Sequence, residues 1–301
     1  MLQNVKIWIR AARLRTLPLS VAGIISGNAL CLSNREFSWI LFSLMMLSAM
    51  LFQVLSNFAN DYGDGIKGTD NAQRIGPERV FQAGLLSRDS LKKGIQFTAG
   101  LAFLVAITLI LLALGGNSWQ YIFLFVVLSV ASIWAAVKYT IGNNAYGYYG
   151  WGDIFVFLFF GGLSVLGSFF LQKNSLSIDA VLLVFVIGNL SVAVLNLNNM
   201  RDIESDKVAG KRTVAVILGV KNAKRYHIFL IMGALLGLFI FLYKTQPLNF
   251  GLPLLSCIPL VFHLKRVINN TKPKDLDPEL KIVALSTFAI SFSLFITFYL
   301  N

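Results

Sequence analysis

The sequence WILFSLMMLSAMLFQVLSNF (Trp39–Phe58) runs directly into NFANDYGDGIKGTD (Asn57–Asp70). The first stretch is almost entirely apolar, and it is long enough for the hydrocarbon core of a bilayer, which needs about 20 residues. The second stretch holds three aspartates. Charged side chains are costly inside a bilayer, so the apolar segment must end where the aspartates begin. Together the two stretches predict a membrane-spanning helix whose tip presents carboxylates at the membrane surface.

The composition of the whole chain is typical of a polytopic membrane protein. Its 301 residues are 56% hydrophobic and only 13% charged, whereas soluble domains carry about 25% charged residues. Because helices satisfy their own backbone groups in lipid, we expect an all-α polytopic membrane bundle of about nine transmembrane helices. The predicted spans lie at about 17–32, 39–59, 96–114, 119–137, 152–171, 178–197, 226–243, 250–264 and 283–300.

The basic residues are divided unevenly between the two sides predicted for this bundle. The N-terminal tail and alternate connections hold 23 of the 26 Lys and Arg residues, and the other connections hold only Arg35, Lys173 and Lys244. An excess of Lys and Arg marks the cytoplasmic loops of membrane proteins. We therefore expect a multi-pass protein of the cell inner (cytoplasmic) membrane with its long loops in the cytoplasm. The same asymmetry explains the net charge of +12 without nucleic acid as a partner.

Acidic residues gather after the second and the sixth predicted spans. If both spans continue as helices, the polar residues that follow them recur every three or four positions and share one helical face. One face would hold Asn57, Asn60, Asp61 and Asp64, and the other would hold Asn199, Asp202 and Asp206. The repeated pattern predicts a single domain, 1–301, built from two pseudo-repeated halves, roughly 1–137 and 138–301.

Two carboxylate faces at one membrane edge would repel each other unless cations lay between them. Carboxylate and amide oxygens suit Mg²⁺, which commonly binds one or two carboxylates together with phosphate oxygens of a substrate. Basic side chains follow both faces, namely Lys67, Arg74, Arg79, Lys207, Lys211 and Arg212. Lys and Arg are suited to the remaining phosphate oxygens. The pattern therefore predicts a site for a magnesium-bridged diphosphate.

These motifs resemble those of the UbiA-type intramembrane prenyltransferase superfamily. That family has an Asn-Asp-x-x-Asp motif after its second helix and an Asp-x-x-x-Asp motif after its sixth, and Asn60–Asp64 and Asp202–Asp206 match them. Three longer stretches are similar to the branch that prenylates 1,4-dihydroxy-2-naphthoate in menaquinone biosynthesis. They are RLRTLPLSVAG (13–23), NDYGDGIKGTDNAQRIGPERV (60–80) and KYTIGNNAYGYYGWGDIFVFLFFG (138–161).

Two positions depart from the general pattern of the superfamily. The third aspartate of the first motif is expected four residues after the second, where this chain has Gly68, and the acid appears instead at Asp70. That shift fits the naphthoate branch. Asn144 and Ala145 stand where the branch is expected to have Arg-Pro.

The resemblance implies transfer of a polyprenyl group from polyprenyl diphosphate to 1,4-dihydroxy-2-naphthoate, with loss of CO₂ and diphosphate, giving demethylmenaquinol. The implied catalytic residues are Asn60, Asp61, Asp64, Asp202 and Asp206, and the implied Mg²⁺ ligands are these five together with Asp70. The residues implied to bind the diphosphate or shape the acceptor end are Lys67, Arg74, Arg79, Lys211, Arg212, Arg13, Lys138 and Tyr139. The active site is expected at the cytoplasmic face, with the isoprenoid tail in the lipid-facing interior.

Other functions remain as alternatives at this point. A related enzyme could use another aromatic acceptor, such as 4-hydroxybenzoate or homogentisate. A cation transporter would need carboxylates near the middle of the bilayer, whereas these lie at span ends. An intramembrane aspartyl protease would need a paired aspartate inside a second span, and a P-loop enzyme would need a Gly-x-x-x-x-Gly-Lys-Ser/Thr motif. The sequence has neither feature, which excludes both classes.

Overall fold

The computed structural model describes residues 2–32, 37–69, 75–116, 119–247 and 249–300. All regular elements in these ranges are helices, which confirms the predicted all-α class. In chain order they are α1 (Leu2–Ala12), η1 (Leu14–Thr16), α2 (Leu17–Ala29), α3 (Trp39–Ile66), α4 (Arg88–Leu114), α5 (Trp119–Lys138), η2 (Tyr146–Tyr148), α6 (Gly152–Val156), η3 (Phe157–Gly167), α7 (Ser168–Lys173), α8 (Ile178–Arg201), α9 (Ile203–Val208), α10 (Val214–Thr245), α11 (Gly251–Leu255), α12 (Ile258–Asn269), η4 (Pro273–Leu276) and α13 (Asp277–Tyr299).

Eight helical segments in the described part of the chain are long and apolar enough to cross a membrane, and they correspond to the second to ninth predicted spans. The first predicted span, 17–32, contains α2, which is apolar but only 13 residues long. That length is about 20 Å, shorter than the hydrocarbon core. α2 instead packs against α13 and η3 inside the bundle. The protein is therefore a multi-pass membrane bundle, as predicted.

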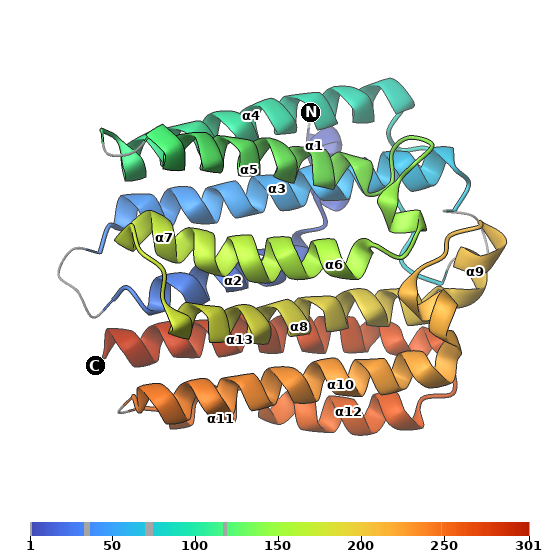
Figure 1. Ribbon diagram of the computed structural model, residues 1–301. Coiled ribbons are helices and arrows are strands. Elements are labelled where there is room, and N and C mark those ends of the chain that lie inside the picture. Colours follow the sequence, from blue (N-terminus) through green and yellow to red (C-terminus); the bar gives the residue numbers. More distant parts are fainter. Residues whose placement is uncertain (1, 33–36, 70–74, 117–118, 248, 301) are drawn as a thin grey trace.

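The helices lie side by side, with α3, α4 and α5 on one side of the bundle and α10, α11 and α12 on the other (Figure 1). Several helices begin at a Ser or Thr whose side-chain oxygen accepts a backbone N–H of the first turn, as is usual for an N-cap. Ser38, Ser87, Ser177 and Thr213 do so at the starts of α3, α4, α8 and α10. These caps define where the long helices start.

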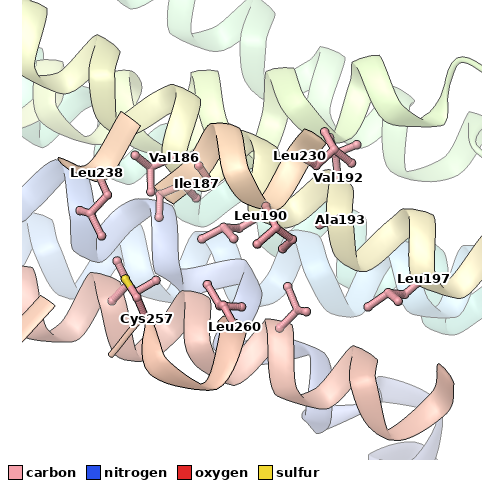
Figure 2. Close-up of a cluster of buried hydrophobic side chains, with 14 of the residues drawn as sticks. Val186, Ile187, Leu190, Val192, Ala193, Leu197, Leu230, Leu238, Cys257 and Leu260 are labelled. Atoms are coloured by element: carbon pink, nitrogen blue, oxygen red, sulfur yellow. The ribbon is translucent and has the colours of Figure 1, made fainter. Parts of the chain in front are cut away.

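The largest apolar cluster lies around α8, which packs against η3, α10 and α13. Figure 2 shows this cluster, in which side chains of α8 such as Leu190 and Leu197 lie with Leu230 and Leu238 of α10 and with Leu260. Truncating a side chain in such a core typically costs about 2–5 kcal/mol. Because α8 is enclosed in this way, the polar segment that follows it has a fixed position.

The segment η3 is an eleven-residue π-helix in the middle of a membrane-spanning run. The π-helix is rare, and it mostly occurs as single-turn bulges, which are frequent at functional sites. Small residues let neighbouring helices approach it closely. A Cβ added at Gly161 would lie 2.8 Å from Cα of Gly188 in α8, and one added at Gly23 would lie 2.1 Å from Oγ of Ser164. η3 is therefore packed backbone to backbone against both α2 and α8.

Candidate functional site

The two acidic motifs lie at the same end of the bundle. The C-terminal end of α3, which bears the first motif, and the short helix α9, which contains part of the second, are both at the right of Figure 1. The positive charge of Lys211 interacts with an aspartate of each motif. Its Nζ lies 3.8 Å from Oδ1 of Asp206, and its charge also acts on Asp64. Residues about 140 positions apart in the chain thus form one cluster of charges.

Asp64 is held from two directions. Nη1 of Arg79 donates to its Oδ2 at 2.8 Å, and the hydroxyl of Tyr148 donates to its Oδ1 at 2.8 Å. Arg79 also donates to the backbone oxygen of Asn60 at 2.7 Å. These contacts fix the carboxylate of Asp64 and bind the segment that follows the first motif back against α3. Charge-assisted hydrogen bonds of this kind are about twice as strong as neutral ones.

Asp61 is almost completely buried, with 1% of its surface exposed. Its Oδ1 accepts a long hydrogen bond from the backbone N–H of Phe81, at 3.4 Å. Its Oδ2 is buried without a hydrogen-bond partner within the described part of the chain. A buried carboxylate oxygen in this state is costly, so it is expected to have a ligand when the protein works. Oδ1 of Asn60 lies nearby in sequence and is 3.4 Å from Oγ1 of Thr140.

The second motif is organised by Arg201, which was not among the predicted site residues. Its Nε and Nη2 donate to the two oxygens of Asp202 at 3.0 and 2.6 Å. It also binds Asp277 at the start of α13 and donates to Oδ1 of Asn198 at 2.8 Å. A guanidinium at the end of an apolar helix and next to an aspartate is the signal that could have found it.

Electrostatics keep the ammonium of Lys211 charged. Burial by itself would lower the pKa of the Lys211 ammonium, but the carboxylates of Asp64 and Asp206 outweigh that effect and raise it above its usual value. Burial and the Asp64 carboxylate raise the pKa of Tyr148, so its hydroxyl stays protonated and continues to donate. The ammonium of Lys67 lies 3.9 Å from the centre of the Tyr148 ring, in a cation–π contact.

A cavity of about 550 Å³ opens from this cluster into the bundle. Its polar end is lined by Asn60, Asp64, Arg79, Arg201 and Lys211, together with Arg13 and Arg15. The rest of its wall is mostly apolar and includes Phe52, Leu128 and Phe159. A cavity that is cationic at one end and apolar along its length suits an amphiphilic anion.

The other predicted site residues differ in whether they line this cavity. Tyr139 and Arg13 line the cavity, whereas the exposed side chains of Lys138 and Arg212 do not. The carboxylates of Asp202 and Asp206 do not line it either, whereas Arg201 and Lys211, which pair with them, do. Asp70 and Arg74 lie outside the described residues. Asp61 does not line this cavity. It lines a second, smaller cavity of about 420 Å³ next to α1, together with Arg13 and Arg79, which line both.

The oxygen atoms of both acidic motifs suit a hard cation that is bound partly by the protein and partly by phosphate oxygens of a substrate. Within the described ranges, no three His, Cys, Asp or Glu side chains converge on a point that could hold a metal by themselves. Mg²⁺ does not need such a cage, because it keeps waters and takes phosphate oxygens beside one or two carboxylates. The buried Oδ2 of Asp61, which has no partner among the described residues, and the all-oxygen composition of both motifs match this requirement.

Comparisons with known proteins point to one family. The chain matches the UbiA prenyltransferase family over residues 20–297. It is 41% identical over 275 residues to the 1,4-dihydroxy-2-naphthoate octaprenyltransferase of Escherichia coli (strain K12), covering 91% of this chain and 89% of that protein. It is 39% identical over 292 residues to the protein of the same name in Haemophilus influenzae, covering 96% and 94%.

A solved structure has the same fold. It is a UbiA homolog from Archaeoglobus fulgidus bound to DMAPP and Mg²⁺, which matches with a TM-score of 0.65 at 14% sequence identity and covers 96% of this chain and 99% of that one. At this level of identity the likeness concerns the fold alone.

Proposed function

The chain belongs to the UbiA prenyltransferase family, and from that premise we propose that it is a 1,4-dihydroxy-2-naphthoate polyprenyltransferase. It transfers a polyprenyl group from polyprenyl diphosphate to the naphthoate ring, with loss of CO₂ and diphosphate, and gives demethylmenaquinol for menaquinone biosynthesis. The observation that supports this best is the cavity itself, whose cationic end and apolar length match a diphosphate with an isoprenoid tail.

The acidic motifs are proposed to hold Mg²⁺ with the diphosphate. Asn60, Asp61 and Asp64 on one side, and Asp202 and Asp206 on the other, would supply oxygen ligands beside the phosphate oxygens. When bound, the metal neutralises negative charge that develops on the departing diphosphate. The role predicted for Asp70 as a further ligand stays a prediction.

The basic residues that line the cavity bind the diphosphate oxygens that the metal leaves open. Arg79 and Lys211 already hold carboxylates of the two motifs, so a diphosphate placed between the motifs meets both cations at once. Preorganised positive charge of this kind stabilises the leaving group as the bond breaks. The roles predicted for Lys67, Arg74, Lys138 and Arg212 stay predictions.

Aromatic side chains near the polar end protect the reactive cation. Breaking the allylic C–O bond leaves its electron pair on the diphosphate and a positive charge on the isoprenoid. Tyr139, Tyr146 and Phe155 line this part of the cavity, and the rings of Tyr146 and Phe155 stack with centroids 4.0 Å apart. Burial raises the pKa of Tyr139 and Tyr146, so both rings stay neutral. Their faces attract the cation and their bulk excludes water.

The ring carbon of the acceptor then attacks this cation, and the carboxylate on that carbon leaves as CO₂. The distribution of Lys and Arg supports a cytoplasmic position for this polar end, in a protein of the inner membrane. Both the diphosphate and the aromatic acid would then reach the site from the cytoplasm, while the tail stays in an apolar environment.

The proposal is tested by the choice of acceptor. Purified protein is incubated with octaprenyl diphosphate, Mg²⁺ and one acceptor at a time, and the products are identified by mass spectrometry. We expect octaprenylated naphthoquinol, with the mass of the decarboxylated product, only with 1,4-dihydroxy-2-naphthoate. Equal or faster turnover of 4-hydroxybenzoate or homogentisate would assign the protein to another acceptor.

A further inference from the structure

The cavity extends far beyond the charged cluster. Along α3 its lining residues run from Asp64 to Met45, a separation of 19 residues, or about 28 Å at 1.5 Å per residue. Its deep end is formed by side chains from α2, α3, α4, α5 and α7, none of them more than 8% exposed. They are Ile24, Met45, Leu109, Ile110, Phe125 and Leu171.

Stacked rings lie at this deep end, where Phe125 lines the cavity. Phe125 stacks on Phe170 with ring centroids 5.6 Å apart and an interplanar angle of 26°. Phe170 also meets Tyr121 edge to face, with centroids 4.9 Å apart. Aromatic pairs in these geometries are stabilised beyond the area that they bury. The far wall of the cavity is therefore a packed aromatic layer.

Buried hydrogen bonds brace the helices around this layer. Nε2 of Gln172 donates to Oδ1 of Asn28 at 2.9 Å and to the backbone oxygen of Ser38 at 3.0 Å. Asn28 is completely buried and also donates to the backbone oxygen of Ile24. These bonds join α2, α7 and the start of α3. The helix α7, which carries Phe170 of this wall, is thus held against α2 and the start of α3.

We propose that this wall limits the length of isoprenoid tail that the cavity accepts, with Phe125 and Gly167 as the residues that set chain-length preference. The inference rests on the proposed function, because it assigns the deep end to the tail of the diphosphate substrate. Gly167 lines the cavity, and a Cβ added there would lie 3.1 Å from Leu163 and 3.6 Å from Phe125. Any larger side chain at Gly167 would therefore occupy space beside the wall.

The apolar volume of the deep end determines which length of isoprenoid tail binds best. Each isoprene unit that fits gains contact with apolar side chains, and the first one that does not fit must bend back or leave the cavity. Apolar pockets discriminate between ligands that differ by one small group by about 10-fold or more. Removing the Phe125 ring adds space at the wall, whereas filling Gly167 removes it.

The experiment compares two variants of the wall with two matched controls. Phe125→Ala enlarges the deep end, and Phe123→Ala makes the same change on the same helix at a side chain that is 64% exposed. Gly167→Leu fills the deep end, and Gly162→Leu makes that change in η3 where an added Cβ meets no atom within 4 Å. Phe125→Leu serves in place of Phe125→Ala if the alanine variant does not fold.

Affinity is measured by competition with labelled farnesyl diphosphate, for a series of geranyl, geranylgeranyl, hexaprenyl, octaprenyl and decaprenyl diphosphates. Relative to wild type, we expect Phe125→Ala to shift the ratio of long-tail to short-tail affinity by about tenfold toward long tails. Gly167→Leu should shift it by a similar factor toward short tails. Both controls should keep the wild-type ratio.

Wild-type length preference in Phe125→Ala and Gly167→Leu alike would overturn the inference, because the tail would then leave the cavity before it reaches the wall. This binding measurement needs no acceptor. A length preference that follows the wall variants would therefore support the inference even in a protein that fails to prenylate the naphthoate, and the two proposals can fail separately.

Discussion

At the scale of single residues, the site is built from buried ion pairs. Arg79 binds Asp64 and Arg201 binds Asp202, in both cases with side chains that are less than 10% exposed. Burying an ion pair costs desolvation energy that the attraction barely offsets, so such pairs contribute little to stability. Their role here is to position charged groups, because they hold Arg79, Arg201 and Asp64 in fixed places at the wall of the cavity.

Lys211 and Arg212 are adjacent in sequence but differ in position, which makes them a matched pair. Lys211 is buried and lines the cavity, whereas the side chain of Arg212 is exposed and does not. We expect Lys211→Ala to lower kcat/KM for octaprenyl diphosphate by about 100-fold, as the loss of a preorganised charge does. Arg212→Ala should lower it by only about two- to fivefold, because an exposed ion pair contributes about 0.2–1 kcal/mol. Steady-state kinetics in detergent would measure both, and equal losses would refute this placement.

The spacing of the aspartates was readable from the sequence because helix periodicity alone places Asp61 and Asp64 near one face. The partners of those aspartates were not readable. Tyr148 binds Asp64 from 84 positions away, and Arg201 reaches Asp277 across 76. Such contacts depend on how the helices pack, and a single sequence carries no local signal for that.

At the scale of elements, most span positions could be predicted from hydrophobicity, but the local helix types could not. Residues 152–171 were expected as one span, and the structure divides this run into α6, the π-helix η3 and α7. The break between α1 and η1 at Arg13, where φ is 50°, could not be predicted from the sequence either. Both features arise from tertiary packing that overrides the regular α-helical pattern of the chain.

The close packing of η3 against α8 can be tested by substitution at Gly161. A Cβ at Gly161 would lie 2.8 Å from Cα of Gly188 and 2.9 Å from the backbone oxygen of Val184, so α8 would have to move away. We expect Gly161→Val to lower the free energy of unfolding by about 1–3 kcal/mol, the usual cost of overpacking. The control Gly162→Val faces open space and should keep the wild-type melting temperature. Thermal unfolding in detergent measures both, and an unchanged Gly161→Val would contradict the packing.

At the scale of the whole molecule, charge distribution and site position agree. Both acidic motifs lie at one end of the bundle, and 23 of the 26 basic residues belong to the tail and loops that the sequence assigns to that side. The fold class could be predicted because composition and periodicity report on it directly. The division into two pseudo-repeated halves, 1–137 and 138–301, stays a prediction.

Membrane orientation can be measured with single cysteines in a variant that lacks Cys31 and Cys257, both buried. We expect a cysteine at Glu204, whose side chain is 80% exposed beside the second motif, to react with a membrane-impermeant maleimide only after the inner membrane is opened. A cysteine at Leu176, which is 71% exposed at the opposite end, should react in intact spheroplasts. The reverse pattern would place the site on the outer face.

The central claim is that carboxylates from both motifs bind one lipid diphosphate through Mg²⁺. The most direct measurement is the affinity of the purified protein for octaprenyl diphosphate, with Mg²⁺ and with a chelator. The account predicts that chelation weakens wild-type binding at least about tenfold. Asp61→Asn and Asp202→Asn should each remove most of this Mg²⁺ dependence. The control Asp179→Asn, at the far end of the bundle beside Lys244, should keep it. Equal affinity with and without Mg²⁺ in the wild-type protein would contradict it.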